Sequence, residues 1–482
     1  MEALLLRPLA NRPCESRKAL QALPALVIAF AVIAVLPVWR AARLYCFHNY
    51  DLGIYSQALA LLSPGNLNPW ISGRQLHIFN DHFDPIILLA APWTRLLPAW
   101  QVALLVESVL VALSVVPVWW LWRRGRLSAS AAGLLSALVL LGPTTLSALR
   151  FPVHPTTWAM LPITWLVAAL LERRTVLMLV ALNLLFACKE EFPFVGLVLG
   201  VALLYRREWR PMAWVLALSV AWLALDFAVR PALLGPTEAY GPGLFAGVAS
   251  HPWTYLVERL FAKGAASRIG SILVVIAPLA LFAWRTRRQP DWLVVSLLLP
   301  MLAIRFLGMA WRFHYGAPVG AVAIMAFVPV LGTARVPRWL VVATTVLLIS
   351  ANVHNLRFTA KMWGLPSNAP PRHCPADPAR IAALDVAVNH LVTAPPGPAL
   401  VEGNLVAHLA ARPDVYMVGG LQREASTPYR YVLVEKPPHG DPYPLTGKRI
   451  EELLPRWRQE AQSTYRDDVH LFFAAGKFTT SQ

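Results

Sequence analysis

The chain has 482 residues, of which 57% are hydrophobic and 14% are charged, and its formal net charge is +17. Soluble domains carry about 25% charged residues, so this composition excludes an ordinary soluble globular protein and indicates a membrane protein. The positive charge does not indicate nucleic-acid binding. Residues 357–482 hold 14 Lys/Arg against 12 Asp/Glu, and the remaining excess lies in short basic clusters between apolar runs, where it sets membrane orientation.

The composition changes near residue 356 and divides the chain into two predicted domains. Residues 1–356 are predicted to form a transmembrane domain with an outer loop at 45–98, and residues 357–482 a soluble domain. Basic residues precede the first apolar run, so the N-terminus is expected in the cytoplasm. That run lacks a cleavage site of small residues and is expected to remain as an anchor. Of the four cysteines, Cys46 and Cys374 are those that could meet outside the membrane.

Apolar runs and basic clusters alternate in a way that predicts eleven crossings. Each predicted inward connection carries at least two Lys/Arg, as the positive-inside rule requires. With the N-terminus inside, an odd number of crossings puts the C-terminal domain on the extracytoplasmic side of a bacterial inner membrane. The predicted crossings are 24–41, 99–122, 127–149, 157–171, 176–188, 192–205, 211–229, 269–284, 292–307, 316–331 and 339–354.

Two apolar stretches, residues 85–98 and 176–205, are compatible with more than one arrangement in the membrane. Residues 85–98 number 14 and as a helix would cover about 21 Å, less than the ~30 Å hydrocarbon core. A crossing there would also put the basic residues at 123–126 outside, so a re-entrant or surface-lying element is predicted. Residues 176–205 form either one tilted helix or two short helices that meet at Lys189-Glu190-Glu191. Two helices keep the later basic clusters inside and are preferred. A surface helix is predicted near 253–261.

The soluble domain alternates helical and extended patterns, which predicts a small α/β domain. No catalytic signature is visible in it, so a structural or acceptor-positioning role is expected. The predicted helices are 379–392 and 448–458, and the predicted strands are 398–402, 415–418, 431–435 and 471–474.

Polar side chains that do not suit a lipid environment gather at the predicted outer ends of the helices. Ionisable groups at membrane depth are costly and usually mark function. Glu107 and Asp226 lie inside apolar runs and are expected to pair with bases at the outer face or with polar lipid groups. The five outer groups are Asn49–Gln57, Asn80–Pro85, Phe151–Pro155, Lys189–Glu191 and Arg312–Gly316.

Each outer group also has a structural interpretation, and only their clustering on one side favours function. The structural alternatives are an N-cap of an amphipathic helix for Asp51, a solvated loop for Asp81 and Asp84, a turn for His154, a salt-bridged cap for Lys189–Glu191, and interfacial anchoring for His314 and Tyr315.

At these residues the chain resembles a known family. It is similar to the bacterial membrane proteins of domain of unknown function 2079, which are related in fold to the C-type membrane glycosyltransferases. Those enzymes include protein mannosyltransferases and the aminoarabinose transferase of lipid A. The matching residues are Tyr50-Asp51-Leu52-Gly53 with Gln57, Asp81-His82-Phe83 with Pro85 and Pro92, Phe151 with His154-Pro155, Lys189-Glu190-Glu191, His314-Tyr315, Ala407-His408-Leu409-Ala410 with Arg412, Val415-Tyr416 and Tyr431-Val432-Leu433.

The resemblance spans about residues 45–475, with one mild departure. The family usually has Lys-Glu-Asp where this chain has Lys189-Glu190-Glu191, a change that keeps the charge. The resemblance implies an active site in the first outer loop, where Asp51 would be the general base that takes the proton of an acceptor hydroxyl. Asp51 would alternatively bind a divalent cation, Mg or Mn, together with Asp81.

The other motif residues take binding roles by the same resemblance. Asp81, His82 and Glu190 would orient the acceptor or bind the metal. The donor phosphate would need a cation, for which the candidates are Lys189, His314 and Arg312. Further substrate-binding candidates are Gln57, His154 and Tyr315.

The resemblance therefore predicts a glycosyltransferase that moves a sugar from a polyprenyl-phosphate donor in the membrane to a hydroxyl group of a glycan, lipid or protein on the periplasmic side. One alternative is a transporter or flippase of a lipid-linked or polar solute. Its polar groups would be expected near the midplane rather than at the outer edge. The other alternative is a non-catalytic scaffold that keeps the fold.

Overall fold

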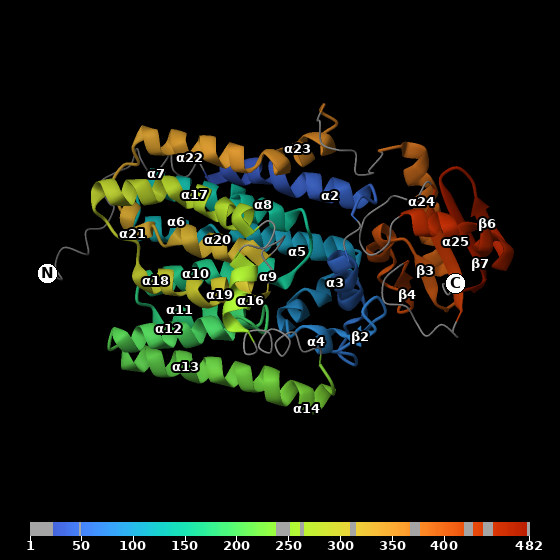
Figure 1. The fold of residues 1–482 in the computed structure, drawn as a ribbon, viewed down its shortest axis with the longest axis horizontal. Coiled ribbons are helices and arrows are strands. Elements are labelled where there is room, and N and C mark those ends of the chain that lie inside the picture. The colour runs from blue at the N-terminus through green and yellow to red at the C-terminus, as the bar shows by residue number, and fades with distance from the viewer. Residues whose placement is uncertain are drawn as a thin grey trace.

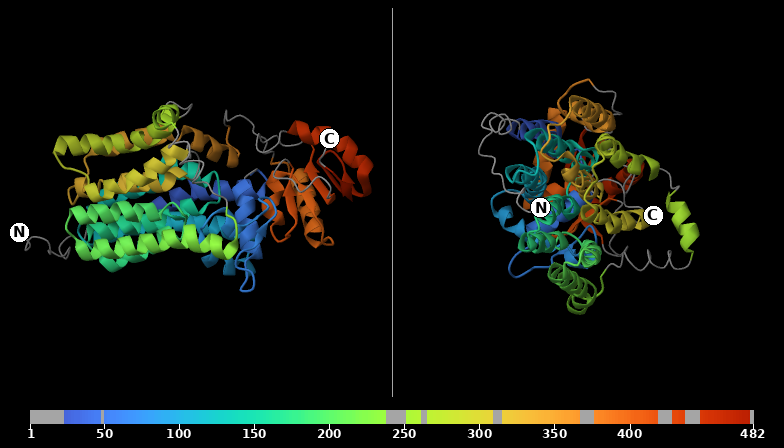
Figure 2. Two further views of the ribbon diagram at one scale, coloured as in Figure 1. Left: turned by 60° about the horizontal axis from the view of Figure 1, so that its bottom comes forward. Right: turned by 90° about the vertical axis from the view of Figure 1, so that its left-hand side faces the viewer.

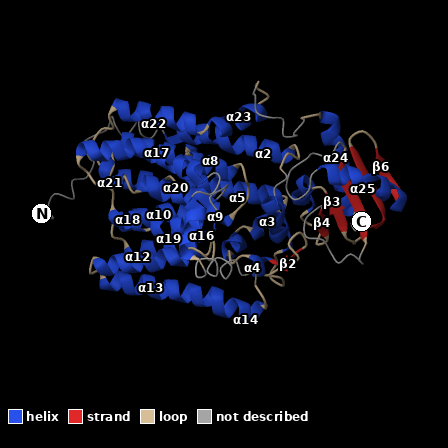
Figure 3. Ribbon diagram, in the orientation of Figure 1, coloured by secondary structure: helices blue, strands red, loops and turns tan. Residues whose placement is uncertain are grey.

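The computed structural model describes residues 23–47, 50–237, 251–260, 265–308, 315–366, 376–418, 428–436 and 447–479. Its helices lie along the long axis of the molecule as one bundle, and the strands that follow residue 398 form a compact domain at one end (Figures 1 and 3). The left view of Figure 2 shows the same separation, and the right view looks along the bundle with the C-terminal domain behind it. We call the end of the bundle next to this domain the domain-proximal end, and the opposite end the distal end.

Among the residues that the structure describes, four helices are long and apolar enough to cross a membrane, and all four coincide with predicted crossings. They are Leu23–Arg43, Ala99–Arg123, Ala129–Leu149 and Trp209–Leu234. They contain, in order, η1 (Ala31–Val35) with α2 (Leu36–Arg43), α5 (Ala99–Leu113) with α6 (Val116–Arg123), α7 (Ala129–Leu141) with α8 (Pro143–Leu149), and α13 (Trp209–Ala224) with η4 (Leu225–Val229) and α14 (Arg230–Leu234). A bent pair, α22 (Arg338–Ala351) and α23 (Val353–Met362), adds a fifth span if its 67° bend lies within one crossing.

The remaining six predicted crossings are shorter apolar helices among the described residues. Because these helices are short, the total of eleven crossings and their orientation stay predictions. They are Pro155–Leu171, which joins α9 (Pro155–Trp158) and α10 (Met160–Leu171), then α11 (Thr175–Phe186), α12 (Pro193–Tyr205), Ile272–Thr286 within α17 (Ala265–Thr286), Trp292–Ile304 across α18 (Trp292–Ser296) and α19 (Leu298–Gly308), and Gly316–Leu331 across α20 (Gly316–Met325) and α21 (Val328–Leu331).

Residues 85–98 do not form a spanning helix. They hold two 3-10 helices, η2 (Pro85–Leu89) and η3 (Ala91–Arg95), each with a proline in its first turn. Leu89, Trp93 and Leu96 are exposed, which fits an element that lies at a membrane surface. Residues 176–205 form two helices, α11 and α12, and the predicted surface helix is α16 (Pro252–Leu260).

Four connections between helices end in the same left-handed turn, which also follows α2 at Tyr45 and α23 at Gly364. In each, a residue with positive φ follows the helix and its neighbour donates back to a carbonyl five residues earlier, which is the Schellman arrangement. After α12, Arg207 (φ 60°) donates to Leu204 at 2.8 Å and Glu208 to Leu203 at 3.0 Å. The four residues are Gly125, Arg173, Arg207 and Arg287.

These four turns lie together at the distal end. The Arg126 guanidinium pairs with Glu172 at 2.5 Å, and Arg206 pairs with Asp291 at 3.5 Å. The basic clusters that the sequence places in inward connections therefore meet at one end of the bundle, opposite the C-terminal domain.

The C-terminal domain is a five-stranded sheet with a helix on each face. The strand order is β4-β3-β5-β7-β6, in which β3 is parallel to β4 and β5, and β7 is antiparallel to β5 and β6. One buried cluster lies between the sheet and α24, and another between the sheet and α25. The elements are α24 (Pro378–Thr393), β3 (Ala399–Val401), η6 (Gly403–Leu409), β4 (Val415–Met417), β5 (Tyr429–Glu435), α25 (Gly447–Glu460), β6 (Ala461–Asp467) and β7 (Leu471–Phe478).

The sequence located six of these elements and missed β6 and η6. β6 is an edge strand whose side chains are mostly exposed, so it lacks the apolar alternation that identifies a strand. The predicted domain boundary at 356/357 falls inside α23. Cys46 is disulfide-bonded, while Cys374, the partner considered from the sequence, lies outside the described residues.

Candidate active site

The helix that carries Asp51, α3 (Tyr50–Leu61), is buried on every side. Residues 52–59 are all buried, so the amphipathic pattern inferred from the sequence is wrong. The helix packs against α5 and against η6 of the C-terminal domain. Asp51 and Tyr55 lie one turn apart and share a face, while Gly53 and Gln57 share a different one. The two faces of α3 therefore meet two different surroundings.

Asp51 lies among charged groups from two other segments. Burial raises the pKa of its carboxyl group to about 6, against the lowering effect of Lys189 and His82 and with a further rise from Asp81. The residue keeps partial access to solvent. A carboxylate with this pKa is mostly ionised at pH 7 and is also basic enough to accept a proton.

His82 is oriented by Glu190 from the turn between α11 and α12. The His82 Nδ1 lies 2.9 Å from Glu190 Oε1, and the Phe83 N–H donates to Glu190 Oε2 at 3.2 Å. Burial raises the pKa of Glu190, but the charge and hydrogen bond of His82 together with Lys189 outweigh it and hold that pKa well below its usual range. Glu190 is thus an acceptor that keeps a proton on His82 Nδ1.

Lys189 is the buried cation of the site. Its side chain is 4% exposed, and its Nζ lies 4.8 Å from the centre of the Tyr315 ring. A cation over an aromatic face gains electrostatic stabilisation that partly offsets its loss of hydration. The sequence treated Lys189 and Tyr315 as separate motifs, and the fold brings them together.

His154 lies at the centre of an aromatic group in the same site. Its ring centre is 5.5 Å from that of Tyr55, 6.1 Å from that of His82 and 5.7 Å from that of Tyr315. Its Nδ1 accepts a hydrogen bond from the Thr156 N–H at 3.1 Å, so the neutral ring carries its proton on Nε2.

Glu107 supports His154 from within α5. Its Oε2 accepts the His154 backbone N–H at 2.8 Å. Asp226 pairs with a base, as the sequence indicated, through Arg230 at 3.0 Å. Arg230 in turn donates to the Phe79 carbonyl at 3.3 Å, which connects α14 to the segment that leads into Asp81.

Asp81 is engaged by an arginine that the sequence did not single out. Strands β1 (Trp70–Ile71) and β2 (Leu76–His77) form a hairpin whose turn carries Arg74. The Arg74 guanidinium donates to both Asp81 oxygens, at 2.7 and 3.0 Å. Asp81 is 6% exposed, so the solvated-loop interpretation is wrong for it.

A divalent cation on Asp51 and Asp81 fits this donor set poorly. Both Asp81 oxygens already accept from Arg74, and the described part of the chain contains no group of three His, Cys, Asp or Glu side chains arranged to hold a metal ion. The role of Mg or Mn remains a prediction from the resemblance.

Asp84 is a further buried carboxylate, so the solvated-loop interpretation is wrong for it as well. It is fully buried, and Oδ2 accepts the Tyr55 hydroxyl at 2.6 Å. Within the described residues Oδ1 has no hydrogen-bond partner. Burial raises the pKa of Asp84 to about 7, opposed by the Tyr55 hydrogen bond and by His82.

Gln57 lies away from this cluster, although it was predicted to bind substrate. Its Nε2 donates to Ser72 Oγ and to the Arg412 carbonyl, both at 2.9 Å, and its Oε1 accepts the Ser72 N–H at 3.0 Å. Gln57 follows Asp51 by six residues, or about 240° around a helix, and that spacing was the signal in the sequence. Arg312 and His314 lie outside the described residues.

Comparisons with known proteins agree with the fold. The family model with the description Predicted membrane protein (DUF2079) matches residues 40–467. The structure is similar to the crystal structure of ArnT from Cupriavidus metallidurans bound to undecaprenyl phosphate, with a TM-score of 0.50 and 14% sequence identity over 95% of this chain and 99% of that chain. At this identity the likeness shows an ArnT-like fold and no more. No curated protein matches.

Proposed function

The chain belongs to the family Predicted membrane protein (DUF2079), and we propose that it is a membrane glycosyltransferase. It would move a sugar from a polyprenyl-phosphate donor to an acceptor hydroxyl group at the periplasmic face of the bacterial inner membrane. The observation that carries the proposal is Asp51, a partly accessible carboxylate held beside a buried lysine. The ArnT-like fold supports it, since the similar ArnT structure holds undecaprenyl phosphate.

The proposed reaction is a displacement at the anomeric carbon of the donor sugar. Asp51 takes the proton of the acceptor hydroxyl as its oxygen forms a bond to that carbon. The bond between the anomeric carbon and the phosphate oxygen breaks, and the electron pair leaves with the polyprenyl phosphate. Protonated Asp51 then returns its proton to water.

Lys189 is proposed to stabilise the leaving phosphate. Negative charge grows on that group as the bond breaks, and a fixed cation is worth more in a partly dehydrated site than in water. Lys189 is buried, and its Nζ lies over the Tyr315 ring. Arg312 and His314 remain proposed additional contacts to the phosphate.

His82, Glu190 and His154 are proposed to orient the acceptor. Glu190 fixes the orientation of the His82 ring through Nδ1. In neutral His154 the proton is on Nε2, because Nδ1 accepts from the Thr156 N–H. The acceptor is a glycan, lipid or protein hydroxyl, and the sugar is a hexose or pentose.

The test uses the purified full chain in lipid nanodiscs with a panel of polyprenyl-phosphate hexoses and pentoses. We expect wild-type protein to release polyprenyl phosphate, and Asp51→Asn to do so at least ~100-fold more slowly while still binding the donor. Lys189→Gln is expected to weaken donor binding.

The matched control for these variants is Asp377→Asn. Asp377 is an exposed N-cap of α24, where asparagine caps as well as aspartate, so turnover is expected to stay at the wild-type rate. If no donor in the panel binds or is consumed, or if Asp51→Asn keeps wild-type turnover, the proposed function is wrong.

A further inference from the structure

We infer that the C-terminal domain is a positioning part of the active site, which acts by holding α3 and the β1–β2 hairpin through Gln57 and Gly53. The inference rests on the proposed function only in taking Asp51 as the base. The sequence of this domain shows no catalytic signature, and the domain contacts both α3 and the hairpin.

The first contact is a buried hydrogen-bond junction at Gln57. The side-chain amide donates to the Arg412 carbonyl of the C-terminal domain and to Ser72 Oγ of the hairpin, and accepts the Ser72 N–H. Ser72 Oγ also contacts the carbonyl of Val415 at the start of β4. Gln57 and Ser72 are 2% and 0% exposed, so a lost partner here leaves a buried polar group unpaired, which destabilises the junction.

The carbonyl of Arg412 is itself fixed by the Arg412 side chain. Its guanidinium donates to the carbonyls of Leu391 at 2.7 Å and Ala394 at 3.0 Å, and to that of Gly397 at 3.0 Å. These acceptors belong to the end of α24 and the turn that follows it. The acceptor that Gln57 uses is therefore anchored in the domain core rather than in a free loop.

The second contact is a close approach of backbone at Gly53. A Cβ atom at this position would lie 2.8 Å from Val406 Cγ1 and 3.2 Å from Val406 Cβ of η6. Only glycine lets α3 pack this closely against the C-terminal domain. Gly53 and Gln57 lie one turn apart, so η6 and the residues before β4 hold one whole face of the helix.

Asp51 and Tyr55 project from a different face of the same short helix. A shift of the Gly53 face must therefore move the Asp51 carboxylate relative to Lys189 and His82. The hairpin carries Arg74, the partner of Asp81, so the same junction fixes a second charged pair. A misplacement of about 1 Å can cost ~100-fold in rate.

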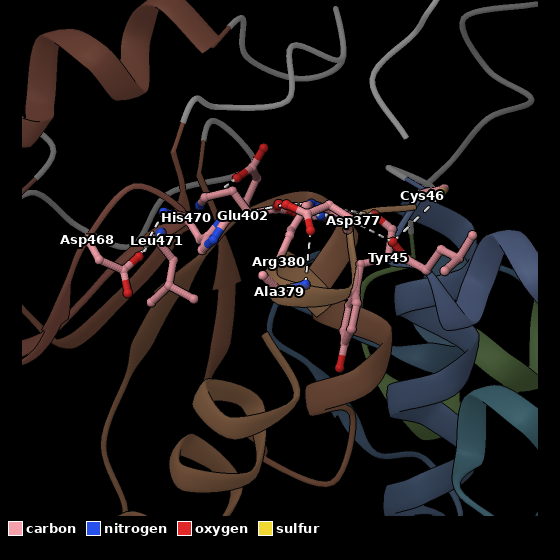
Figure 4. A network of polar contacts seen from close by, with 12 residues as sticks. Tyr45, Cys46, Asp377, Ala379, Arg380, Glu402, Asp468, His470 and Leu471 are labelled. Atoms are coloured by element: carbon pink, nitrogen blue, oxygen red, sulfur yellow. Dashed lines mark hydrogen bonds and ion pairs between the residues drawn. The ribbon is translucent and has the colours of Figure 1, made fainter. Parts of the chain in front are cut away.

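The domain is fastened independently to the segment that precedes α3. Arg380 pairs with Glu435 at 2.5 and 2.9 Å and donates to the carbonyl of Leu44 at 3.0 Å. Figure 4 shows Arg380 of α24 beside Tyr45 at this junction, and the Tyr45 hydroxyl donates to Asp385 at 2.7 Å. The Gln57 and Gly53 contacts can thus be loosened without releasing the domain.

The experiment compares Gly53→Ala, Val406→Ala and the double variant in the full chain. Gly53→Ala is expected to raise hydrogen exchange at residues 50–61 and 70–77 and to lower kcat about 10-fold, with the donor KM within about 2-fold of wild type. Val406→Ala removes the clashing methyl groups, so the double variant is expected to recover most of both losses. Gln57→Leu is expected to act like Gly53→Ala.

The matched control is Trp457→Phe, which removes the Nε1 hydrogen bond to the Thr479 carbonyl at 3.2 Å on the α25 face of the sheet. It should loosen the C-terminal domain without changing exchange at 50–61. The inference is overturned if Gly53→Ala is equally impaired with and without Val406→Ala, or if Gln57→Leu leaves exchange at 50–61 unchanged. If wild-type protein consumes no donor, the proposed function fails, and the exchange measurements alone still decide this inference.

Discussion

Asp51 gives the proposed reaction a pH dependence. Its carboxyl group has a pKa of about 6 in the folded chain, raised by burial, and only the ionised form can take a proton from the acceptor. We therefore expect kcat/KM to rise with pH, to reach half its plateau near pH 6, and to level off above pH 7. A pH–rate profile of the purified chain checks this. A rate that falls between pH 5 and 7 would contradict a base at this position.

Asp84 gives the folded state a pH dependence of its own. The pKa of Asp84 is about 7 in the folded chain and ~3.9 in an unfolded chain. Between these two pH values Asp84 is protonated in the folded state and ionised in the unfolded state. The free energy of unfolding must then fall as pH rises from about 4 to about 7. Asp84→Asn keeps an acceptor for Tyr55 and cannot ionise, so the thermal midpoint in detergent should fall less over this range.

Asp84→Ala is the comparison for that measurement. It leaves the Tyr55 hydroxyl without its acceptor, so it should lower the free energy of unfolding by about 1–3 kcal/mol. The thermal midpoint should therefore fall at every pH. Equal slopes of midpoint against pH in wild type and Asp84→Asn would show that Asp84 is not the group responsible.

At the residue scale the sequence predicted which polar residues gather in one place better than it predicted the contacts between their side chains. Asp51, His82 and Lys189 from three of the polar groups do converge, whereas Gln57 lies away from them. The sequence did not reveal that Asp84 points inward, because Asp84 lies in the irregular segment between α4 (Ile78–Asp81) and η2, where spacing fixes no direction. Arg74 was missed because a lone arginine in a polar loop carries no pattern. The convergence supports the site without testing its chemistry.

At the element scale the turn after α12 makes a test of backbone strain possible. Arg207 has a φ of 60°, a conformation that costs an L-residue with a side chain about 1–2 kcal/mol and costs glycine little. Its side chain is exposed, so Arg207→Gly should raise the free energy of unfolding by up to about 1 kcal/mol. The thermal midpoint should rise with it. The neighbouring basic residues keep the connection positively charged.

Arg206→Gly is the matched control for that element. Arg206 has a φ of −79°, pairs with Asp291 and lies over the Trp292 ring at 4.8 Å, so glycine there should lower the midpoint. If both glycine variants lower it, the turn is not strained at Arg207.

The elements that sequence predicted well are those whose burial leaves a continuous apolar run. Every predicted crossing coincides with a helix, because a helix inside a bundle or a bilayer must be apolar along its length. Elements defined by tertiary contact were missed: η6 is short and is shaped by its packing on α3, and β6 pairs as an exposed polar edge. The membrane-spanning role of the six shorter helices is a property of the whole molecule and its bilayer.

At the scale of the whole molecule, orientation ties the topology to the proposed chemistry. The four turns at Gly125, Arg173, Arg207 and Arg287, with their neighbouring arginines, lie at the distal end, and Asp51 lies at the domain-proximal end, so a bilayer crossed by the bundle separates the two. Val469 in the C-terminal domain is 77% exposed, and Gln289, in the connection after α17, is also exposed. We expect Val469→Cys to react with a membrane-impermeant maleimide in intact spheroplasts, and Gln289→Cys to react only after permeabilisation.

The parent chain, labelled in parallel, gives the background from its four native cysteines, of which Cys188 is buried and Cys46 is disulfide-bonded. The two engineered sites report on the number of crossings between them. An odd number places the two cysteines in different compartments, so they must give opposite labelling results. Reversed labelling would put Asp51 and Lys189 on the cytoplasmic side and would contradict a periplasmic transfer reaction. Labelling of both sites in intact spheroplasts would instead remove an odd number of crossings after residue 289 and would contradict the crossing count of eleven.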